Sequence, residues 1–221
     1  MYKLRMKFSK EGKAIYISHL DLMRTIQRAF LRAGLPLAYS EGFNPHARIS
    51  VVLPLSVGAS SVCEFCDFGL NEELPIDGMA EKLSAVMPEG IKVNSVYEPS
   101  TKAAEAKWLS VSGRLEYDNE SDLCAMCNAL SEYWCSGNTI SLMKKTKRGE
   151  GEFVISDHIK EISFEPCENY VLLKALISAQ EPTVNPDNII AAMKQNKKEL
   201  APDFAAFKRC ELYKADMESF S

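Results

Sequence analysis

The sequence has no long apolar run. Its longest apolar stretches, such as 49–54 and 170–178, are far shorter than the roughly 20 residues with which a helix crosses a bilayer. The first eight residues alternate basic and apolar side chains, and so lack the continuous apolar segment of a secretory signal peptide. These two absences predict a cytoplasmic protein that contacts no membrane.

Complete catalytic motifs are absent as well. The sequence contains no glycine-rich phosphate loop, no nucleophile elbow and no His-Glu-x-x-His zinc motif. Histidine, the commonest proton-transfer residue, occurs only three times, as His19, His46 and His158. We therefore expect a chain that is not an enzyme on its own, and keep a catalytic role as a second hypothesis.

Cysteine is present, but its pattern excludes several uses. An odd number, seven, without a secretion signal favours reduced thiols in a reducing compartment. No Cys-x-x-x-Cys-x-x-Cys run occurs, so the chain does not itself hold the usual iron–sulfur cluster of radical S-adenosylmethionine (radical SAM) enzymes. We predict no cofactor in this chain.

Two Cys-x-x-Cys pairs, Cys63/Cys66 and Cys124/Cys127, together suggest a four-thiolate zinc site. The local pattern weighs against that site. Residues 62–68 have the composition of a strand, in which a spacing of three puts Cys63 and Cys66 on opposite faces. Cys124 and Cys127 share a helix face, but they do so at the spacing of core residues. We interpret these cysteines as small core residues and predict no metal ligands.

Charge is unevenly distributed along the chain. The formal net charge is −4, yet residues 1–50 contain nine Lys and Arg against three acidic residues, a local balance of +6. The other 171 residues carry −10. Such asymmetry is typical of an anion-binding end on an acidic, solubilising body. A second basic group follows at 144–148 and includes Lys145 and Lys147.

Hydrophobic periodicity in the first half predicts the order β-α-β-β-α-β. Strands are expected at 2–8, 49–57, 62–70 and 91–97, and helices from Ser18 to about 33 and at 76–86. Ser18 and Asp21 fit a capping box at the start of the first helix. The expected apolar stripe of that helix consists of Leu20, Met23, Ile26 and Phe30.

The second half repeats this order by pattern, although not by sequence. Strands are expected at 108–117, 139–143, 152–155, 170–176 and 207–213, with helices at 121–135 and 185–196 and an insertion at 157–164. The segment 98–105 is the expected connector. The prediction is therefore an α+β protein with two ferredoxin-like halves, 1–98 and 106–221, each with an antiparallel sheet.

The candidate catalytic residues are His19 and His46. Each has a polar neighbour, Asp21 for His19 and Asn44 for His46. If the loop before the second strand folds back over the helix start, the two groups converge. They would then form a proton-transfer pair or a His/Asp metal site, although no third ligand is evident. The alternative is a helix cap at Asp21 and ordinary hydrogen-bonded histidines.

A polar loop at 36–46 is the candidate recognition element. It is longer than the usual short connection, and its aromatic residues Tyr39 and Phe43, beside Asn44, suit stacking on an unpaired base. The alternative is a well-packed connection between the first helix and the second strand. The sequence leaves both interpretations open.

Basic side chains are the candidate phosphate contacts. Arg24, Arg28 and Arg32 recur every four residues, and so lie along one side of the first helix. The predicted cationic set is completed by Lys3, Arg5, Lys7, Arg48, Lys145 and Lys147, the last two at a hairpin tip. Although a solvated helix face is the alternative, the pattern favours a phosphate-rich ligand such as RNA.

The segments 18–24, 32–46 and 49–50 resemble a bacterial family of unknown function that is linked to radical SAM proteins. The resemblance covers residues 1–70, and the matching residues are His19, Asp21, Arg24, Tyr39, Gly42, Phe43, Asn44, Pro45 and His46. It implies a radical SAM partner that carries the iron–sulfur cluster and S-adenosylmethionine. It supplies no reaction.

Three functions follow as hypotheses. The first is an accessory or substrate-recognition protein for a radical SAM enzyme that acts on RNA. The second is a metal-independent RNA nuclease that uses His19 or His46 as its acid or base. The third is a module that binds a small molecule or peptide for the same partner, which suits the acidic second half better.

Overall fold

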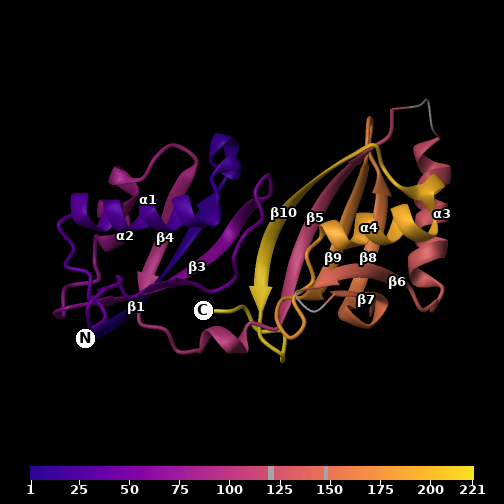
Figure 1. The fold of residues 1–221 in the computed structure, drawn as a ribbon. Helices are drawn as coiled ribbons and strands as arrows, with labels where there is room; N and C mark the ends of the chain where they lie inside the picture. The colour runs from indigo at the N-terminus through magenta and orange to yellow at the C-terminus, as the bar shows by residue number, and fades with distance from the viewer. Residues whose placement is uncertain (119–121, 147–148) are drawn as a thin grey trace. The chain divides into compact units, whose positions relative to one another are not determined.

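The computed structural model of the chain describes residues 1–118, 122–146 and 149–221 (Figure 1). Within these residues the chain forms four α-helices and ten strands, a mixed α and β architecture in which the sheets are mostly antiparallel. It divides into two compact units, Met1–Glu105 with Phe220–Ser221, and Ala106–Ser219. Each unit has its own strands and helices.

The first unit follows the order strand, helix, two strands, helix, strand. Its elements are β1 (Tyr2–Lys10), the 3-10 helix η1 (Gly12–Tyr16), α1 (His19–Arg32), β2 (Ile49–Val51), β3 (Ser60–Leu70), α2 (Met79–Val86), β4 (Ile91–Tyr97) and the 3-10 helix η2 (Ala103–Glu105). The strands lie in the order β4-β1-β3-β2, and neighbours are antiparallel. The predicted elements of this half are confirmed, except that the second strand has only 3 residues. Pro54, which has no N–H to donate, falls inside the longer strand that was expected.

The core of the first unit lies between its sheet and its two helices. Leu4, Met6 and Phe8 alternate along β1 and are fully buried against the helices. Phe30 of α1 packs onto them and meets Phe68 of β3 edge to face, with ring centroids 4.7 Å apart. Side chains of α2 belong to the same cluster, so both helices cover one face of the sheet (Figure 1). Burial of a side chain such as Phe30 stabilises the fold by about 1.5–3 kcal/mol.

The buried face of α1 differs from the predicted stripe. Leu22, Ile26 and Phe30 are buried at a spacing of four, whereas Leu20 is 67% exposed. Leu20 lies about 200° around the helix from Leu22, and so points away from the sheet. Leu31 is also exposed. The outer face of α1 therefore carries leucines among its arginines.

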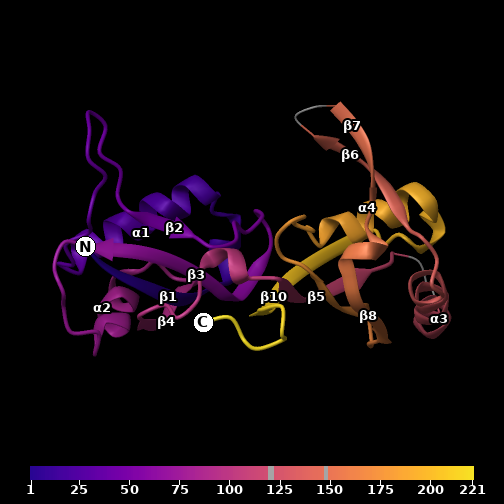
Figure 2. The same ribbon diagram turned by 90° about the horizontal axis from the view of Figure 1, so that it is seen from below.

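The second unit repeats the alternation and adds a hairpin. Its elements are β5 (Trp108–Glu116), α3 (Leu123–Cys135), β6 (Ser141–Thr146), β7 (Gly149–Val154), the 3-10 helix η3 (Ser156–His158), β8 (Ile159–Pro166), β9 (Val171–Ser178), α4 (Asp187–Asn196), the 3-10 helix η4 (Lys198–Leu200) and β10 (Phe204–Tyr213). Four of its strands lie in the antiparallel order β10-β5-β9-β8. β6 and β7 form a separate two-stranded sheet (Figure 2).

One prediction for this half is wrong. The sequence pattern predicted 139–143 and 152–155 as strands of the repeated β-α-β-β-α-β order and 157–164 as an insertion. In the structure β8 belongs to the main sheet, and the hairpin of β6 and β7 is the addition. A register shift between Ile159 and Glu161 interrupts the two-residue alternation of β8, and periodicity alone therefore does not find this strand.

The described α-helices are short compared with a membrane-spanning segment. In the part of the chain that the structure describes, none is both long enough and apolar enough to cross a bilayer. The longest helix, α1, has 14 residues, against the roughly 20 that a span requires.

Candidate functional site

Helix α1 begins with a polar cluster. Ser18 caps the helix, because its Oγ accepts a hydrogen bond from the Asp21 N–H at 3.2 Å and donates one to Asp21 Oδ2 at 2.7 Å. Arg24 Nη1 donates to Asp21 Oδ1 at 3.1 Å. The hydrogen bond from Ser18, and then that from Arg24, hold the pKa of Asp21 below its ordinary value. The predicted cap by Ser18 is confirmed, whereas the Asp21 carboxylate accepts from the Ser18 hydroxyl and from Arg24 rather than from the Ser18 N–H of a complete capping box, so Asp21 and Arg24 have a structural role.

His19 is the first residue of α1 and is half-buried. Its Nδ1 is shielded from solvent and has no hydrogen-bond partner within the described residues. The carboxylate of Asp21 is occupied by Ser18 and Arg24, and so does not orient the imidazole. A catalytic histidine is normally oriented by such a partner. His19 therefore lies at the predicted place, without the contact that a proton relay uses.

The segment between α1 and β2 closes on itself. The Ser40 N–H donates to the His46 carbonyl at 2.8 Å, and the His46 N–H donates to Ser40 Oγ at 2.9 Å. Tyr39 and Ala47 pair as an isolated bridge, and Gly42 at the far end has φ of 116°, which favours glycine. The segment therefore forms a narrow loop with a closed base, which extends from the unit beyond the C-terminal end of α1 (Figure 2).

This segment, residues 39–47, is called the aromatic loop below. Phe43 is fully exposed and Tyr39 is 54% exposed. Asn44 and His46 are exposed as well. A phenylalanine without packing contacts forgoes about 1.5–3 kcal/mol of burial energy. The aromatic loop is therefore not the well-packed connection that was the alternative to a recognition loop.

The two candidate histidines lie near opposite ends of α1. His19 is its first residue, the aromatic loop follows its last, and the 14 residues between span about 21 Å. The base of the loop is held at the start of β1, since the Ala38 N–H donates to the Gly69 carbonyl at 2.8 Å and Gly69 pairs with Lys3. Within the described residues no hydrogen bond or ion pair joins the two groups. The predicted shared cleft is not found.

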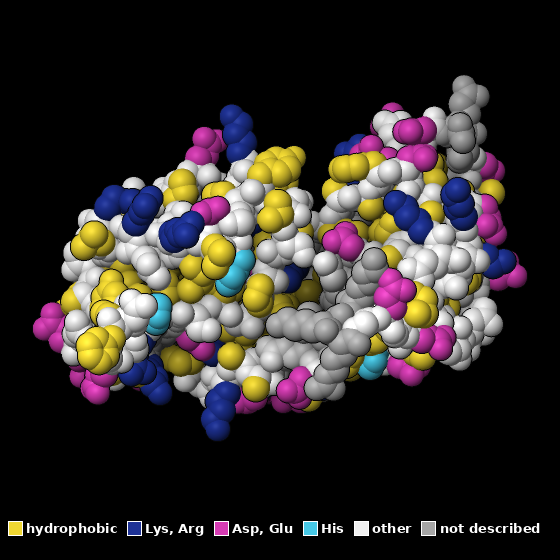
Figure 3. Space-filling model, viewed as in Figure 1, with side chains coloured by type: hydrophobic (Ala, Val, Ile, Leu, Met, Phe, Trp, Pro, Cys, Tyr) yellow, Lys and Arg dark blue, Asp and Glu magenta, His cyan; other side chains and the backbone are white. Residues whose placement is uncertain are grey.

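Most of the predicted arginines remain available at the surface. The exposed ones are Arg24, Arg28, Arg32 and Arg48. Figure 3 shows Lys and Arg side chains gathered over α1, with hydrophobic side chains between them. Arg32 Nη2 also donates to the Val86 carbonyl at 2.7 Å, and Arg48 Nε donates to the Tyr39 carbonyl at 3.5 Å. Arg48 is thereby attached to the base of the aromatic loop.

Two cations of the first fifty residues are buried. Lys10 donates from Nζ to a main-chain carbonyl at 3.0 Å. Arg5 is completely buried, and its Nε and Nη2 donate to Asp67 Oδ1 and Oδ2 at 2.5 and 3.0 Å. Its remaining N–H groups donate to the Thr101 hydroxyl and carbonyl and to the Ser221 main-chain oxygen, so all five donors have acceptors. The prediction that Arg5 contributes to a phosphate-binding surface is wrong.

The second basic group lies on the hairpin of β6 and β7. Lys145 belongs to β6, where its backbone pairs opposite Glu150. Lys147 lies outside the described residues. The predicted hairpin exists, and the contact of Lys145 and Lys147 with phosphates stays a prediction.

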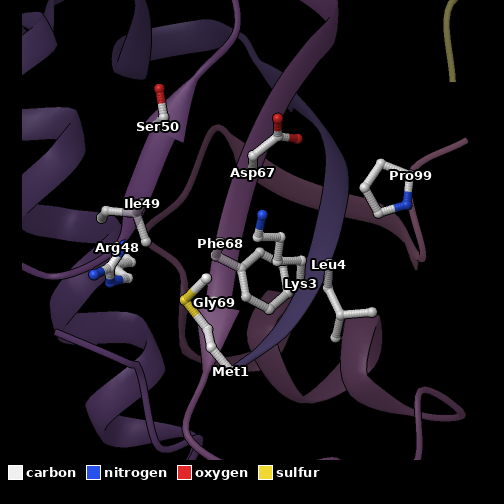
Figure 4. Close-up of a pocket in the computed structure, with 10 residues that line it drawn as sticks. All are labelled: Met1, Lys3, Leu4, Arg48, Ile49, Ser50, Asp67, Phe68, Gly69 and Pro99. Carbon is white, nitrogen blue, oxygen red and sulfur yellow. The ribbon is translucent and has the colours of Figure 1, made fainter. Parts of the chain in front are cut away.

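A cavity of about 340 Å³ lies beside β1, β2 and β3 of the first unit (Figure 4). Its lining residues are Met1, Lys3, Leu4, Arg48, Ile49, Ser50, Asp67, Phe68, Gly69 and Pro99. Arg48 and Ser50 come from the β2 side, and Lys3 and Asp67 come from β1 and β3. The Asp67 carboxylate is engaged by Arg5, so the charges left at this cavity are the cations of Lys3 and Arg48.

Sequence reasoning found Lys3 and Arg48 but missed the rest of this lining. The available signal was Gly69, because a glycine inside a strand often marks the close approach of another group. A Cβ at this position would lie 2.8 Å from Met1 Sδ, so the glycine allows the Met1 side chain to lie over β3. Met1 thereby becomes part of the lining of the cavity.

Comparisons with known proteins identify the family. The chain matches, over residues 3–186, a family described as uncharacterized protein conserved in bacteria (DUF2344). Because this match spans most of the chain, the protein belongs to that family, and the predicted resemblance to a bacterial family of unknown function is confirmed. The family description does not mention radical SAM proteins.

The comparisons with curated proteins and with solved structures do not indicate a function. No curated protein matches the chain. One similar solved structure is a crystal structure of an unknown protein from Galdieria sulphuraria, with 10% identity and a TM-score of 0.24 over 94% of this chain and 98% of that one. A similarity at this level supports no inference about fold or function.

Proposed function

We propose that the first unit recognises single-stranded RNA and that the chain is an accessory or substrate-recognition protein for a radical SAM enzyme. The observation that carries the proposal is the fully exposed Phe43, held on a loop whose base is closed by Ser40 and His46. Such a ring offers a surface on which an unpaired base stacks, which contributes about 1–3 kcal/mol per base. A preformed loop also lowers the entropy cost of binding.

Exposed cations supply the second component, contacts to phosphate. Arg48 lies at the base of the aromatic loop, and Arg24 and Arg28 lie on the outer face of α1. Phosphate contacts release counterions, so this part of the affinity falls as the salt concentration rises. Stacking and charge together suit a single strand better than a duplex, whose bases are already stacked.

The proposed partner is a radical SAM enzyme that carries the iron–sulfur cluster and S-adenosylmethionine. This step rests on the resemblance of residues 18–24 and 32–46 to a family linked to such enzymes. In the proposal the chain binds and positions the RNA, and the partner carries out the reaction. The separation of His19 from His46 supports this division of labour over a nuclease that uses both histidines.

We also propose that each unit is a ferredoxin-like module. The support is the shared strand order, β4-β1-β3-β2 in the first unit and β10-β5-β9-β8 in the second. In both units one helix follows the first strand and another precedes the last. The hairpin of β6 and β7 is then an addition to the second module.

A small anionic molecule is the second candidate ligand. The cavity beside β1, β2 and β3 is of a suitable size, and Lys3 and Arg48 are the cations at its wall. This candidate places the ligand next to the aromatic loop, because Arg48 belongs to both sites. It requires no stacking on Phe43.

A fluorescence anisotropy titration tests the proposal. The full chain is titrated into labelled single-stranded RNA and into the matching RNA duplex, at about 50 and 200 mM salt. We expect binding to the single strand that weakens at the higher salt concentration, and weaker binding to the duplex. Absence of binding to the single strand at the lower salt concentration would show that the RNA part of the proposal is wrong. Thermal stabilisation by small phosphorylated compounds in that case would favour the second candidate.

A further inference from the structure

The start of α3 carries two thiols that the proposed function does not use. Cys124 and Cys127 lie in the first two turns of this helix. Asp122 caps it, because its Oδ1 accepts hydrogen bonds from the Cys124 N–H at 2.9 Å and the Ala125 N–H at 3.1 Å. Helical residues three apart have Cα atoms about 5 Å from each other. That separation lies within the range of about 4.4–6.8 Å that a disulfide bond spans.

The two thiols differ in exposure. The sequence pattern placed both in the core, but α3 buries Cys127, Leu130 and Trp134 and leaves Cys124 exposed. Cys127 is 5% exposed. The expectation that Cys124 is a core residue is therefore wrong, because the buried stripe begins one turn later. An accessible thiol next to a shielded one is the arrangement that thiol–disulfide exchange uses, with one attacking and one resolving sulfur.

A third thiol, Cys167, directly follows β8, the strand that Cys135 of α3 contacts. Cys135 at the end of α3 donates from Sγ to the Ile162 carbonyl of β8 at 3.6 Å. Burial raises the pKa of Cys127, and Cys124 and Cys167 raise it further.

The remaining chemistry of this cluster favours exchange over metal binding. Within the described residues no group of three or more His, Cys, Asp or Glu side chains is placed to hold a metal ion. None of the seven cysteines, all of which lie within the described residues, forms a disulfide bond. Cys124 is thus an accessible thiol with a partner three residues away.

We propose that Cys124 and Cys127 form a redox-active dithiol that low-molecular-weight disulfides, such as glutathione disulfide, convert to an intramolecular disulfide. The Cys124 thiolate attacks one sulfur of glutathione disulfide, which forms a mixed disulfide and releases one glutathione. The Cys127 thiolate then attacks Cys124 Sγ, which forms the Cys124–Cys127 bond and releases the second glutathione. The dithiol loses two electrons, the glutathione disulfide gains them, and the two thiol protons pass to the released glutathiones.

The same helix contains a matched control. Cys135, its last residue, is exposed like Cys124 but has a carbonyl rather than a thiol at its sulfur. Glutathione disulfide should therefore leave a lasting adduct on Cys135. Cys63 and Cys66 in β3 are both buried, so this pair lacks an accessible thiol such as Cys124 that could attack glutathione disulfide first, and neither should react.

The test is mass spectrometry of the reduced full chain after incubation with glutathione disulfide and rapid alkylation. Cleavage after Glu132 separates the Cys124/Cys127 peptide from the Cys135 peptide. We expect the first peptide to lose two hydrogen atoms without an adduct, and the second to gain one glutathione. In Cys127→Ser and in Cys127→Ala, a glutathione adduct on Cys124 should accumulate, roughly tenfold or more above its level in the unaltered chain.

Two outcomes would overturn the proposal. One is an adduct that persists on Cys124 as it does on Cys135 in the unaltered chain. The other is a disulfide that Cys167→Ser abolishes, because Cys167 would then be the resolving residue in place of Cys127. Far-ultraviolet circular dichroism of each variant establishes that the fold is retained.

Discussion

Arg5 fixes the last residues of the chain against the first unit. Its guanidinium donates to oxygens of Thr101 and Ser221 and lies over the ring of Phe220, 4.5 Å from the centroid. Phe220 in turn meets Phe65 of β3 edge to face at 5.1 Å. The charge that the sequence offered as a phosphate contact is thus a buried structural element, balanced by Asp67.

Asp67→Asn should destabilise the protein, because it leaves the buried Arg5 guanidinium without a counter-charge. We expect the free energy of unfolding to fall by about 2–3 kcal/mol, somewhat less than for a wholly buried pair since Asp67 is 34% exposed. Urea denaturation followed by circular dichroism measures it. Arg24→Gln is the control, because it removes the solvent-exposed pair with Asp21 and should have little effect. Equal effects of the two substitutions would contradict this role of Arg5.

Substitution of two glycines, Gly58 and Gly90, distinguishes the effect of backbone strain on stability from the effect of a steric clash. Gly58 and Gly90 have φ of 89° and 87°, but an added Cβ meets nothing within 4 Å at Gly58 and overlaps the Glu11 carbonyl oxygen at Gly90. Gly58→Ala should cost about 1–2 kcal/mol of stability from the left-handed conformation alone. Gly90→Ala should cost clearly more, because the backbone of Glu11 must move. Thermal unfolding midpoints compare the two, and a smaller loss for Gly90→Ala would refute the close approach.

At the scale of elements, α1 depends on its N-terminal cap. Ser18→Ala removes an acceptor for the Asp21 N–H and a donor to its carboxylate, and should cost about 1 kcal/mol at pH 7. The pKa of Asp21 is lowered in the folded state, so its stabilising contribution is present above its ordinary pKa of 3.8 and is lost as the pH falls through the lower folded value. Urea midpoints at pH 7 and pH 3 measure this dependence.

The difference between the unaltered chain and Ser18→Ala should therefore shrink at acidic pH. Ser18→Thr is the matched control, since threonine retains a capping hydroxyl. A difference that stays constant between pH 7 and pH 3 would show that the Asp21 carboxylate takes no part in the cap.

The sequence predicted elements well where one periodicity runs without interruption. α1, with its cap at Ser18, and β1, with its two-residue alternation, are examples. The prediction failed where contacts with a neighbouring element determine which face of a helix is buried or which strand joins the sheet. Leu20 fits a helical stripe by spacing, but the sheet contacts the face of Leu22, and the register shift in β8 conceals a strand of the main sheet. Both decisions depend on which surface the neighbouring element covers.

The candidate site was predictable in its parts but not in its assembly. The length of the aromatic loop and the presence of Phe43 were visible in the sequence, and the structure shows that ring exposed. The separation of His19 from His46 follows from the direction in which the loop leaves α1, which spacing does not encode. The burial of Arg5 depends on residues about 100 and 200 positions away, and no local pattern reports it.

For the molecule as a whole, the account assigns recognition to the first unit. Fewer cationic side chains of residues 1–50 lie at the surface than the sequence contains, because Arg5 and Lys10 are buried. The exposed arginines over α1 and at the base of the aromatic loop are among the charges that remain for phosphate. The acidic remainder of the chain repels RNA, so binding should be confined to one surface.

The most direct test of this account is the affinity of two phenylalanine variants for single-stranded RNA, measured by anisotropy at one low salt concentration. Phe204 of β10 is 57% exposed, which makes Phe204→Ala a control for the loss of an exposed phenylalanine outside the aromatic loop. The account predicts that Phe43→Ala weakens binding about tenfold, from the loss of one stacked base, while Phe204→Ala binds as the unaltered chain does. Equal affinities of the Phe43→Ala variant and the unaltered chain would contradict it.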